Sequence, residues 1–430
     1  MRNTSAAGAV STLTHVALGA SKLEPLALNG GPKAVQWPAD KQAAVTKWPR
    51  YGAEEKQALS TLLDNNRFYA EIPLLERETR DYFHAPYAKA HCNGTSALIS
   101  AFFALNLPAG SEILAPSYTA WATTAPLHLL GLVPVFVDVD PRTACFSVED
   151  AERRLTAQTR AIVVNHAWGL PCEMDHISAF AKKHGLRVVE DAAQAQGAVL
   201  QGRKAGSWGE IGAFSFQMSK ALPAVEGGIA IYQSREAYER ATTFGNYELP
   251  SSFPADSAYR KYAGTGFGPK FRIHPLAAAI ARQQLAKLDR MNAVAAQNAS
   301  SLNQRLLELP GLAAQHVRAD MQRVYWSAHL LFFDAKRAGF SKAALLKALE
   351  AEGVRISGAP YDEQHKYVLY SEVKWWHHKP PIPEHLPGCA QVNASSLRLP
   401  LFREPAPELI DQYARAFEKV WAHRSALARS

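Results

Sequence analysis

The stretch GAFSFQMSK at residues 212–220, closed by EGG at residues 226–228, is the part of the chain around which the rest is organised. Its apolar, strand-like run delivers Lys220 into surroundings rich in Phe, Met, Ala and Gly. An amine in such surroundings is poorly solvated, and burial favours its neutral, nucleophilic form. Lys220 is therefore a candidate Schiff-base residue, although a lysine that follows a strand is more often simply solvated.

The composition describes a globular enzyme. With 430 residues, 47% of them hydrophobic, the chain is long enough for a large core and for two domains. Its net charge of +8 is dispersed, so a nucleic-acid-binding arm is not expected. No run of about 20 apolar residues occurs, so a membrane span is not expected either. The four cysteines lack disulfide or zinc spacing, so we expect no metal and a cytoplasmic location.

Strand-like and helical segments alternate after the N-terminal region. This rhythm predicts a mostly parallel sheet covered by helices on both faces. Ligand groups should then gather at the carboxyl ends of the strands. The expected strands are 112–115, 133–137, 161–165 and 186–190, and the expected helices are 53–65, 174–184 and one that begins near Trp121.

The second half of the chain has a different pattern. A long helix over 277–309 ends at Pro310 and Gly311, and it leads into shorter elements. We expect these to be strands at 324–326 and 329–333 and helices at 341–352 and 407–423. The chain is thus predicted to have three parts: a flexible N-terminal tail (1–25), a large α/β domain (26–275), and a long connecting helix with a small α+β domain (276–430).

Two motifs in the first half suit an anionic and a cationic ligand group. In NGTSAL, residues 93–98, Thr95 and Ser96 open an apolar helix, where hydroxyls and backbone N–H groups can bind an anion; an ordinary helix cap is the alternative. In EDAAQ, residues 190–194, Asp191 emerges where an apolar strand stops and can meet a cationic nitrogen, with Gln194 nearby. Its alternative role is to cap the next helix.

Together these features match the three requirements of pyridoxal phosphate. The cofactor needs a partner for its pyridinium nitrogen, an amine that forms an imine, and a cradle for its phosphate. Asp191, Lys220 and the helix start at Thr95 supply one candidate for each requirement. Their co-occurrence is more specific than any one of them.

The order of the motifs resembles that of the DegT/DnrJ/StrS-type sugar aminotransferases. The resemblance runs from about residue 26 to the C-terminus, and it implies fold type I of the pyridoxal-phosphate enzymes, with a mostly parallel seven-stranded sheet between helices and a smaller C-terminal α+β domain. It also implies a homodimer in which the partner subunit completes each site. The segments that carry it are GTSA (94–97), PVFVDVD (134–140), EDAAQ (190–194), FSFQMSK (214–220) and EGG (226–228).

The resemblance assigns roles residue by residue. Lys220 would form the imine with the cofactor and then move a proton during amino transfer. Asp191 would keep the pyridine nitrogen protonated, and Gln194 would hydrogen-bond the ring hydroxyl. The phosphate would be bound by Thr95, Ser96 and Ser215.

Two positions depart from the family pattern. Many relatives place an aromatic residue, which stacks on the cofactor ring, where this chain has Ala120. Trp121, one place later, could supply that face, or it could be a buried core residue. Many relatives also have an asparagine where Lys270 stands, and they use it to reach the phosphate across the dimer interface. Lys270 could bind the phosphate as a point charge instead. The alternative is that Lys270 is an ordinary solvated residue.

The substrate assignments follow from the same resemblance. Arg272 is available for a substrate carboxylate or phosphate, Tyr361 is expected to contact the substrate, and Gln217 is similar to the branch that acts on cyclitols with glutamine as donor. The predicted reaction moves an amino group from glutamate or glutamine to a nucleotide-linked keto sugar or a keto cyclitol. The alternatives are a sugar dehydratase, whose relatives have a histidine in place of Lys220, and a non-catalytic regulatory protein that binds the cofactor.

Overall fold

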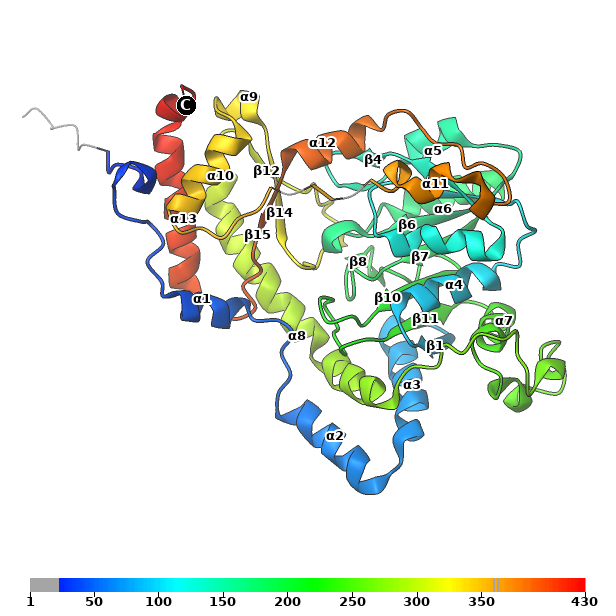
Figure 1. Cartoon of the computed structure of the whole chain (residues 1–430). Helices are drawn as coiled ribbons and strands as arrows, with labels where there is room; N and C mark the ends of the chain where they lie inside the picture. The colour runs from blue at the N-terminus through cyan, green and yellow to red at the C-terminus, as the bar shows by residue number, and fades with distance from the viewer. Residues whose placement is uncertain (1–22, 359, 362, 430) are drawn as a thin grey trace, which may run out of the picture.

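The computed structural model describes residues 23–358, 360–361 and 363–429, so most of the expected tail lies outside the described residues. A large sheet with its covering helices forms one part of the molecule, and a smaller group of helices and strands forms the other (Figure 1). The long helix α8 (Pro275–Leu306) runs between the two (Figure 1). The site is built where these two parts face each other.

Seven strands form the large sheet, which confirms the fold expected from the sequence. Adjacent strands are parallel except for β11, which is antiparallel to both of its neighbours. In spatial order the strands are β1 (Tyr87–His91), β11 (Gly228–Tyr232), β10 (Ile211–Ser215), β7 (Arg187–Asp191), β6 (Thr159–Asn165), β2 (Glu112–Pro116) and β3 (Val133–Val137).

The direction of the strands places their polar ends at one edge. Strands β2, β3 and β10 are buried along their length, as expected where helices cover both faces. Asn165 pairs with Asp191, and Ser215 lies two residues beyond Ala213, which also pairs with Asp191. Gly228, the first residue of β11, pairs with both Ser215 and His91. The carboxyl ends of six strands and the start of β11 therefore share one edge of the sheet.

Six of the described helices surround the large sheet, and those expected at 53–65 and 174–184 are confirmed. The helices are α2 (Ala53–Asn65), α3 (Glu71–Phe83), α4 (Gly94–Ala104), α5 (Val148–Arg154), α6 (Met174–His184) and α7 (Arg235–Gly245). Among the helices of the described residues, none combines the length and the apolar character needed to cross a lipid bilayer. Short strands beside it are β4 (Val139–Asp140), β5 (Cys145–Phe146), β8 (Val199–Leu200), β9 (Arg203–Lys204) and β13 (Met321–Gln322).

Two of the predicted elements are wrong. The helix expected near Trp121 is replaced by two 3-10 segments, η3 (Trp121–Thr123) and η4 (Ala125–Leu130). Pro126 explains the break, because proline has no N–H to donate and disfavours an α conformation in the residue before it. The strand expected at 324–326 is irregular: Val324 N–H bonds the carbonyl of Gly169, and Ser327 has a positive φ of 61°.

The C-terminal part has its own antiparallel sheet and its own core. The strand order is β12 (Leu312–Ala314), β14 (His329–Phe333) and β15 (Ser396–Leu399). Three residues from the N-terminal segment, Leu26, Val35 and Val45, pack into the same core. The predicted domain boundary at residue 275 stays a prediction. The helices of this part are α1 (Ala39–Thr46), α9 (Ala335–Ala338), α10 (Lys342–Ala351), α13 (Pro407–Ala422) and α14 (Arg424–Leu427). Two further helices, α11 (Val368–Ser371) and α12 (Pro387–Ser395), pack against the core of the large sheet.

A buried carboxylate joins the two parts. Asp138 follows β3, and its side chain accepts hydrogen bonds from the backbone N–H groups of Val139 (2.8 Å), Gly388 (2.7 Å) and Cys389 (2.8 Å). Gly388 and Cys389 lie in the first turn of α12, whose N–H groups have no partner within the helix. Asp138 therefore ties the start of α12 to the carboxyl edge of the large sheet.

Replacing this carboxylate should loosen the contact between the two parts. We expect Asp138→Asn to lower the free energy of unfolding by about 1–3 kcal/mol, because the amide has one acceptor oxygen for three N–H groups. The matched control is Asp140→Asn, two residues along, whose ion pair with the exposed Arg142 should contribute less than about 1 kcal/mol. Urea unfolding measures both, and equal losses would contradict the role given to Asp138.

Candidate functional site

The loop between β10 and β11 holds Lys220 at the carboxyl edge of the sheet. Its N–H donates to the carbonyl of Gln217 over 2.8 Å, and the Gln217 side chain accepts bonds from the N–H (2.8 Å) and the hydroxyl (2.6 Å) of Ser219. The indole N–H of Trp48 donates to the carbonyl of Lys220 over 3.0 Å. The backbone of Lys220 is thus fixed from within the loop and from the N-terminal segment.

The amine of Lys220 lies in an apolar setting. Its Nζ is 4.2 Å from the centre of the Trp326 ring. Burial lowers the pKa of Lys220 below its usual value, and the charge of Asp191 partly opposes that shift. A lysine becomes nucleophilic when its neutral form is favoured in this way.

Asp191 is a buried carboxylate at the end of β7. Its Oδ2 accepts a hydrogen bond from the hydroxyl of Thr123 (2.7 Å), which is itself 2.8 Å from the Thr119 hydroxyl, and its Oδ1 accepts one from the N–H of Ala193 (3.1 Å). In the described part of the chain, no cationic side chain lies within 4.0 Å of this carboxylate. A buried anion without a counter-ion fits the protonated ring nitrogen of pyridoxal phosphate.

Gln194 and Tyr361 meet beside Asp191, and the expected substrate contact of Tyr361 stays a prediction. The side-chain oxygen of Gln194 accepts a bond from the N–H of Trp168 over 2.9 Å, and the Tyr361 hydroxyl is hydrogen-bonded to Gln194. Rings of Trp168 and Tyr118 pack against Tyr361 at 5.7 and 5.1 Å. Burial and the charge of Asp191 raise the pKa of Tyr361, so its hydroxyl stays protonated at neutral pH.

The start of α4 approaches the end of β10 closely enough to form a cradle. A Cβ on Gly94 would lie 2.6 Å from the Cβ of Ser215, and one on Gly228 would lie 2.5 Å from the carbonyl of Asn93. Asn93 caps the helix by accepting bonds from the N–H (2.8 Å) and the hydroxyl (2.9 Å) of Ser96. The first N–H groups of the helix have no partner within it, and this geometry fits a phosphate.

The structure brings Thr95, Ser96, Ser215, Asp191, Gln194, Tyr361 and Lys220 to this edge, but it places other candidates elsewhere. Trp121 is 59% exposed, so the alternative of a buried core residue is wrong, while ring stacking stays a prediction. Lys270 and Arg272 line a separate cavity of about 690 Å³. Arg272 is 2.7 Å from a carboxylate oxygen of Glu248 and stacks over Tyr69, so one chain does not present it to its own Lys220.

Several positioning residues were not found from the sequence. Gln196 donates to the carbonyl of Ser215 and accepts from the N–H of Leu222, both over 2.8 Å, so it fixes both ends of the loop that carries Lys220. Its place two residues after Gln194 was an available signal. Trp48 offered no such signal, because it lies 172 residues from Lys220 in the sequence.

A lysine whose pKa is lowered, a strand-end carboxylate and a close-packed helix start at one edge of a mostly parallel sheet are the arrangement expected of an enzyme that uses pyridoxal phosphate. The model of the DegT/DnrJ/EryC1/StrS aminotransferase family matches residues 49–418. The chain belongs to this family, and the resemblance seen in the sequence is confirmed.

Named relatives and solved structures agree with this assignment. The chain is 30% identical to a putative L-glutamine:3-amino-2,3-dideoxy-scyllo-inosose aminotransferase of Streptomyces kanamyceticus, over 88% of each chain. It is 33% identical to an L-glutamine:2-deoxy-scyllo-inosose aminotransferase of Streptoalloteichus tenebrarius, over 80% of this chain and 83% of that one. The structure of an aminotransferase from Psychrobacter cryohalolentis superposes with a TM-score of 0.79 at 26% identity, over 88% of this chain and 99% of that chain.

The Thr123 hydroxyl should matter for amino transfer through Asp191. We expect Thr123→Val to slow the reaction by about 10- to 100-fold, because a hydrogen bond to a charged group contributes about 1.5–3 kcal/mol. The control is Thr124→Val, which removes an equally buried hydroxyl that bonds Tyr370 instead. Steady-state rates and melting temperatures of both variants test the role. Equal rate losses would show that Thr123 acts through packing alone.

The pKa of Lys220 gives a prediction for pH. In the cofactor-free protein, the rate at which Lys220 captures pyridoxal phosphate should rise with pH and level off below the ordinary lysine pKa of 10.5, because burial favours the neutral amine. In Asp191→Asn the inflection should move further down, since the carboxylate that stabilises the ammonium form is gone. Absorbance-monitored capture across a pH series measures both, and an upward shift in the variant would contradict the assignment.

Proposed function

We propose that this aminotransferase uses pyridoxal phosphate to move an amino group from glutamine or glutamate onto a keto cyclitol or a nucleotide-linked keto sugar. The observation that carries the proposal is that two unusual groups lie at the same edge of the sheet. Lys220 has a lowered pKa, and Asp191 is a buried carboxylate that has no counter-ion among the described residues. The names of the relatives that match most of the chain support glutamine as donor and a keto cyclitol as acceptor.

The residues of the site divide the work between them. When bound, pyridoxal phosphate supplies an electron sink for the carbon that gains or loses nitrogen. Asp191 would hold a proton on the ring nitrogen, because an anion buried at this point favours a cation beside it. Gln194 would hydrogen-bond the ring hydroxyl. The amine of Lys220 would accept and return the proton that moves at the reacting carbon.

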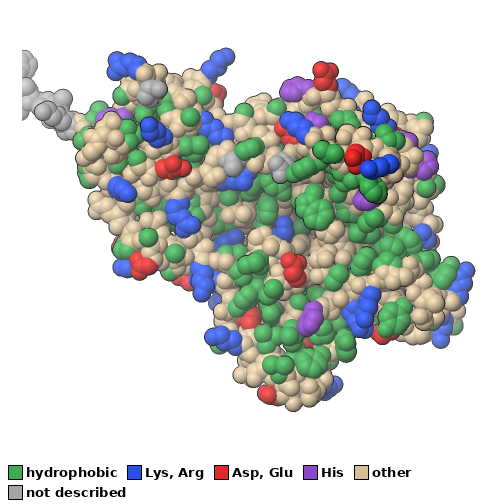
Figure 2. Space-filling model, in the orientation of Figure 1, with side chains coloured by type: hydrophobic (Ala, Val, Ile, Leu, Met, Phe, Trp, Pro, Cys, Tyr) green, Lys and Arg blue, Asp and Glu red, His purple; other side chains and the backbone are tan. Residues whose placement is uncertain are grey.

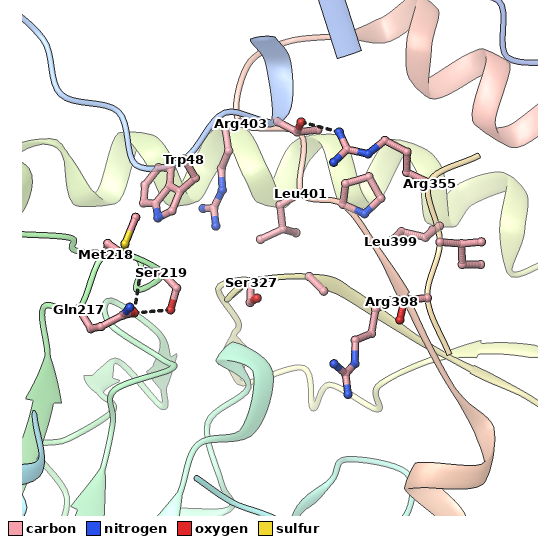
Figure 3. Close-up of a pocket in the computed structure, with 15 residues that line it drawn as sticks. Trp48, Gln217, Met218, Ser219, Ser327, Arg355, Arg398, Leu399, Leu401 and Arg403 are labelled. Carbon is pink, nitrogen blue, oxygen red and sulfur yellow. Dashed lines mark hydrogen bonds between the residues drawn. The ribbon is translucent and has the colours of Figure 1, made fainter. Parts of the chain in front are cut away.

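A cavity beside Lys220 offers room for each substrate in turn. It has a volume of about 720 Å³, within the usual range for small-molecule sites. Gln217, Met218 and Ser219 form one side, and residues of the C-terminal part, among them Ser327 and Leu401, form the other (Figure 3). Figure 2 shows a recess between the two parts of the molecule and Lys and Arg scattered over this face, without a single basic patch.

We further propose a homodimer in which a second copy completes the site. The cavity with Lys270 and Arg272 also holds Cys92 and Glu226, which are close in sequence to Asn93 and Gly228 of the cradle. Basic residues there suit an approach to the phosphate of a neighbouring subunit, in line with the family resemblance. A dehydratase reaction is less well supported, because Lys220 occupies the position at which such relatives have a histidine.

Borohydride reduction tests the cofactor and the lysine together. The purified protein should be yellow, and reduction followed by peptide mass mapping should place a pyridoxyl group on Lys220. Lys220→Ala should bind the cofactor without this covalent link and should lose amino transfer by at least about 1,000-fold, since proton transfer and imine formation are both removed. Lys183→Ala, at an exposed position of α6, is a control that keeps the label. A Lys220→Ala protein with the wild-type rate would overturn the mechanism.

A further inference from the structure

Trp326 covers the amine of Lys220 from the C-terminal part of the chain. The Nζ atom lies 4.2 Å from the centre of the indole ring, a distance at which the face of a tryptophan attracts an ammonium ion. Trp326 is only 9% exposed, so it meets the amine away from bulk water, where this attraction is strongest. The contact therefore joins a side chain of the C-terminal part to the lysine of the large sheet.

A strained turn places this ring. The strand expected at 324–326 does not form, and instead the N–H of Ala328 donates to the carbonyl of Trp326 over 2.6 Å. Ser327, between them, has a positive φ of 61°, which is unfavourable for a residue with a side chain. Ser327 and Ala328 also line the cavity beside Lys220 (Figure 3). Backbone strain of this kind collects at functional sites, because the surrounding structure must hold it.

A second tryptophan fixes the position of the ring. Trp168 packs against Trp326 with 5.3 Å between the ring centres. The backbone N–H of Trp168 donates to Gln194 over 2.9 Å, and its indole N–H donates to the hydroxyl of Tyr118 over 3.1 Å. Gln194 is the residue that would bond the ring hydroxyl of the cofactor. Trp326 is thus held in a fixed place relative to the proposed cofactor site.

The indole N–H of Trp326 gives an independent sign that the site uses the face of the ring. Its Nε1 is buried and has no hydrogen-bond partner among the described residues. A buried tryptophan usually finds such a partner, and the lack of one is unfavourable. A leucine or a phenylalanine would avoid this cost in a site that needed only apolar packing. The tryptophan is explained by its face, which attracts a cation more strongly than that of any other side chain.

We propose that Trp326 is a positioning residue that holds the amine of Lys220 against its ring whenever that amine is free from the cofactor, an assignment that rests on the proposed function. During amino transfer the free amine would accept a proton from the substrate carbon, become an ammonium ion, and give the same proton to the cofactor carbon. The ring attracts the ammonium ion but takes no proton from it. The amine on its long, flexible stem would therefore stay in place with its proton available for return.

The sign of the effect on Lys220 follows from the groups around it. Burial lowers the pKa of Lys220, and the charge of Asp191 raises it. A ring that stabilises the ammonium form also raises the pKa. Loss of the ring would shift the pKa down while the amine stays dry, whereas water that enters the vacated space would shift it up. The arginines of the cavity, Arg355, Arg398 and Arg403, are the same in every variant.

The test measures the pKa of Lys220 in protein loaded with pyridoxamine phosphate, which leaves the amine of Lys220 free. Trace labelling with acetic anhydride across a pH series, read for Lys220 by peptide mass spectrometry, gives the inflection. We expect Trp326→Leu to move this inflection down by about one pH unit, because the contact with the ring face is lost. Trp326→Phe keeps a smaller aromatic face and should give roughly half of that shift.

The first half-reaction with L-glutamine provides a second readout. In Trp326→Leu its maximal rate should fall about 10-fold, because a displaced amine transfers the proton more slowly. The apparent dissociation constant of glutamine should change by less than about 3-fold, since the ring is assigned to the lysine and not to the donor. Deuterium on the α-carbon of glutamine should slow the variant more than the wild type, because proton transfer then limits a larger share of the rate.

Trp376→Leu is the matched control. Trp376 is also a buried tryptophan, 6% exposed, but it stacks on Tyr370 and donates its indole N–H to the carbonyl of Leu369 over 2.9 Å. Its loss should lower the melting temperature without moving the inflection of Lys220 or the isotope effect. If Trp326→Leu does not fold, Trp326→Phe carries the test.

The outcomes distinguish the inference from the function on which it rests. An unchanged inflection would overturn the inference, and so would an upward shift, which would show that the ring only excludes water. A downward shift with an unchanged maximal rate would overturn it as well. A wild-type protein that reacts with no amino acid would overturn the proposed function. Because the inflection is measured without an amino acid, it would still decide whether Trp326 holds the amine of Lys220.

Discussion

The site depends on the close approach of three strand ends and one helix start at one edge of the sheet. Gly228 pairs with Ser215 on one side and His91 on the other, and a side chain there would collide with the carbonyl of Asn93. Gly94, at the helix start, lies equally close to Ser215, so a side chain at residue 94 would collide with it. Because these contacts leave no room for adjustment, the helix start, which we propose binds the phosphate, and the loop that carries Lys220 are positioned by one piece of geometry.

Around this edge the protein accepts buried charges that do not neutralise each other. Among the described residues, Asp191 has hydrogen bonds but no cation within 4.0 Å, and Lys220 is buried enough to lower its pKa. Each arrangement is unfavourable in the protein alone. In the proposed function, a protonated ring nitrogen beside Asp191 and an aldehyde bonded to Lys220 would offset these costs. Perturbed groups of this kind are typical of ligand sites.

Local sequence was sufficient to predict the sheet and to place Lys220, Asp191 and Gln194 at its carboxyl edge. The reason is that a polar residue which follows an apolar strand lies at that edge. It was not sufficient where partners are distant. Trp48 supports Lys220 across 172 residues, and no pattern near either residue encodes that contact. Arg272 is a related case: Glu248, 24 residues before it, pairs with that arginine within one chain, and the role of Arg272 toward a substrate stays a prediction.

A reaction of this kind passes two chemically different substrates through one cavity in succession. The amino donor has a carboxylate beside its reacting carbon, whereas a keto cyclitol has only hydroxyl and carbonyl groups. A nucleotide-linked keto sugar would add a diphosphate to these groups. The cavity proposed for both substrates is lined by Arg355 and Arg398 and also by Leu399 and Leu401. Such a mixed lining suits the succession of substrates, because charged groups of one substrate and uncharged groups of the other would each meet complementary side chains in the same cavity.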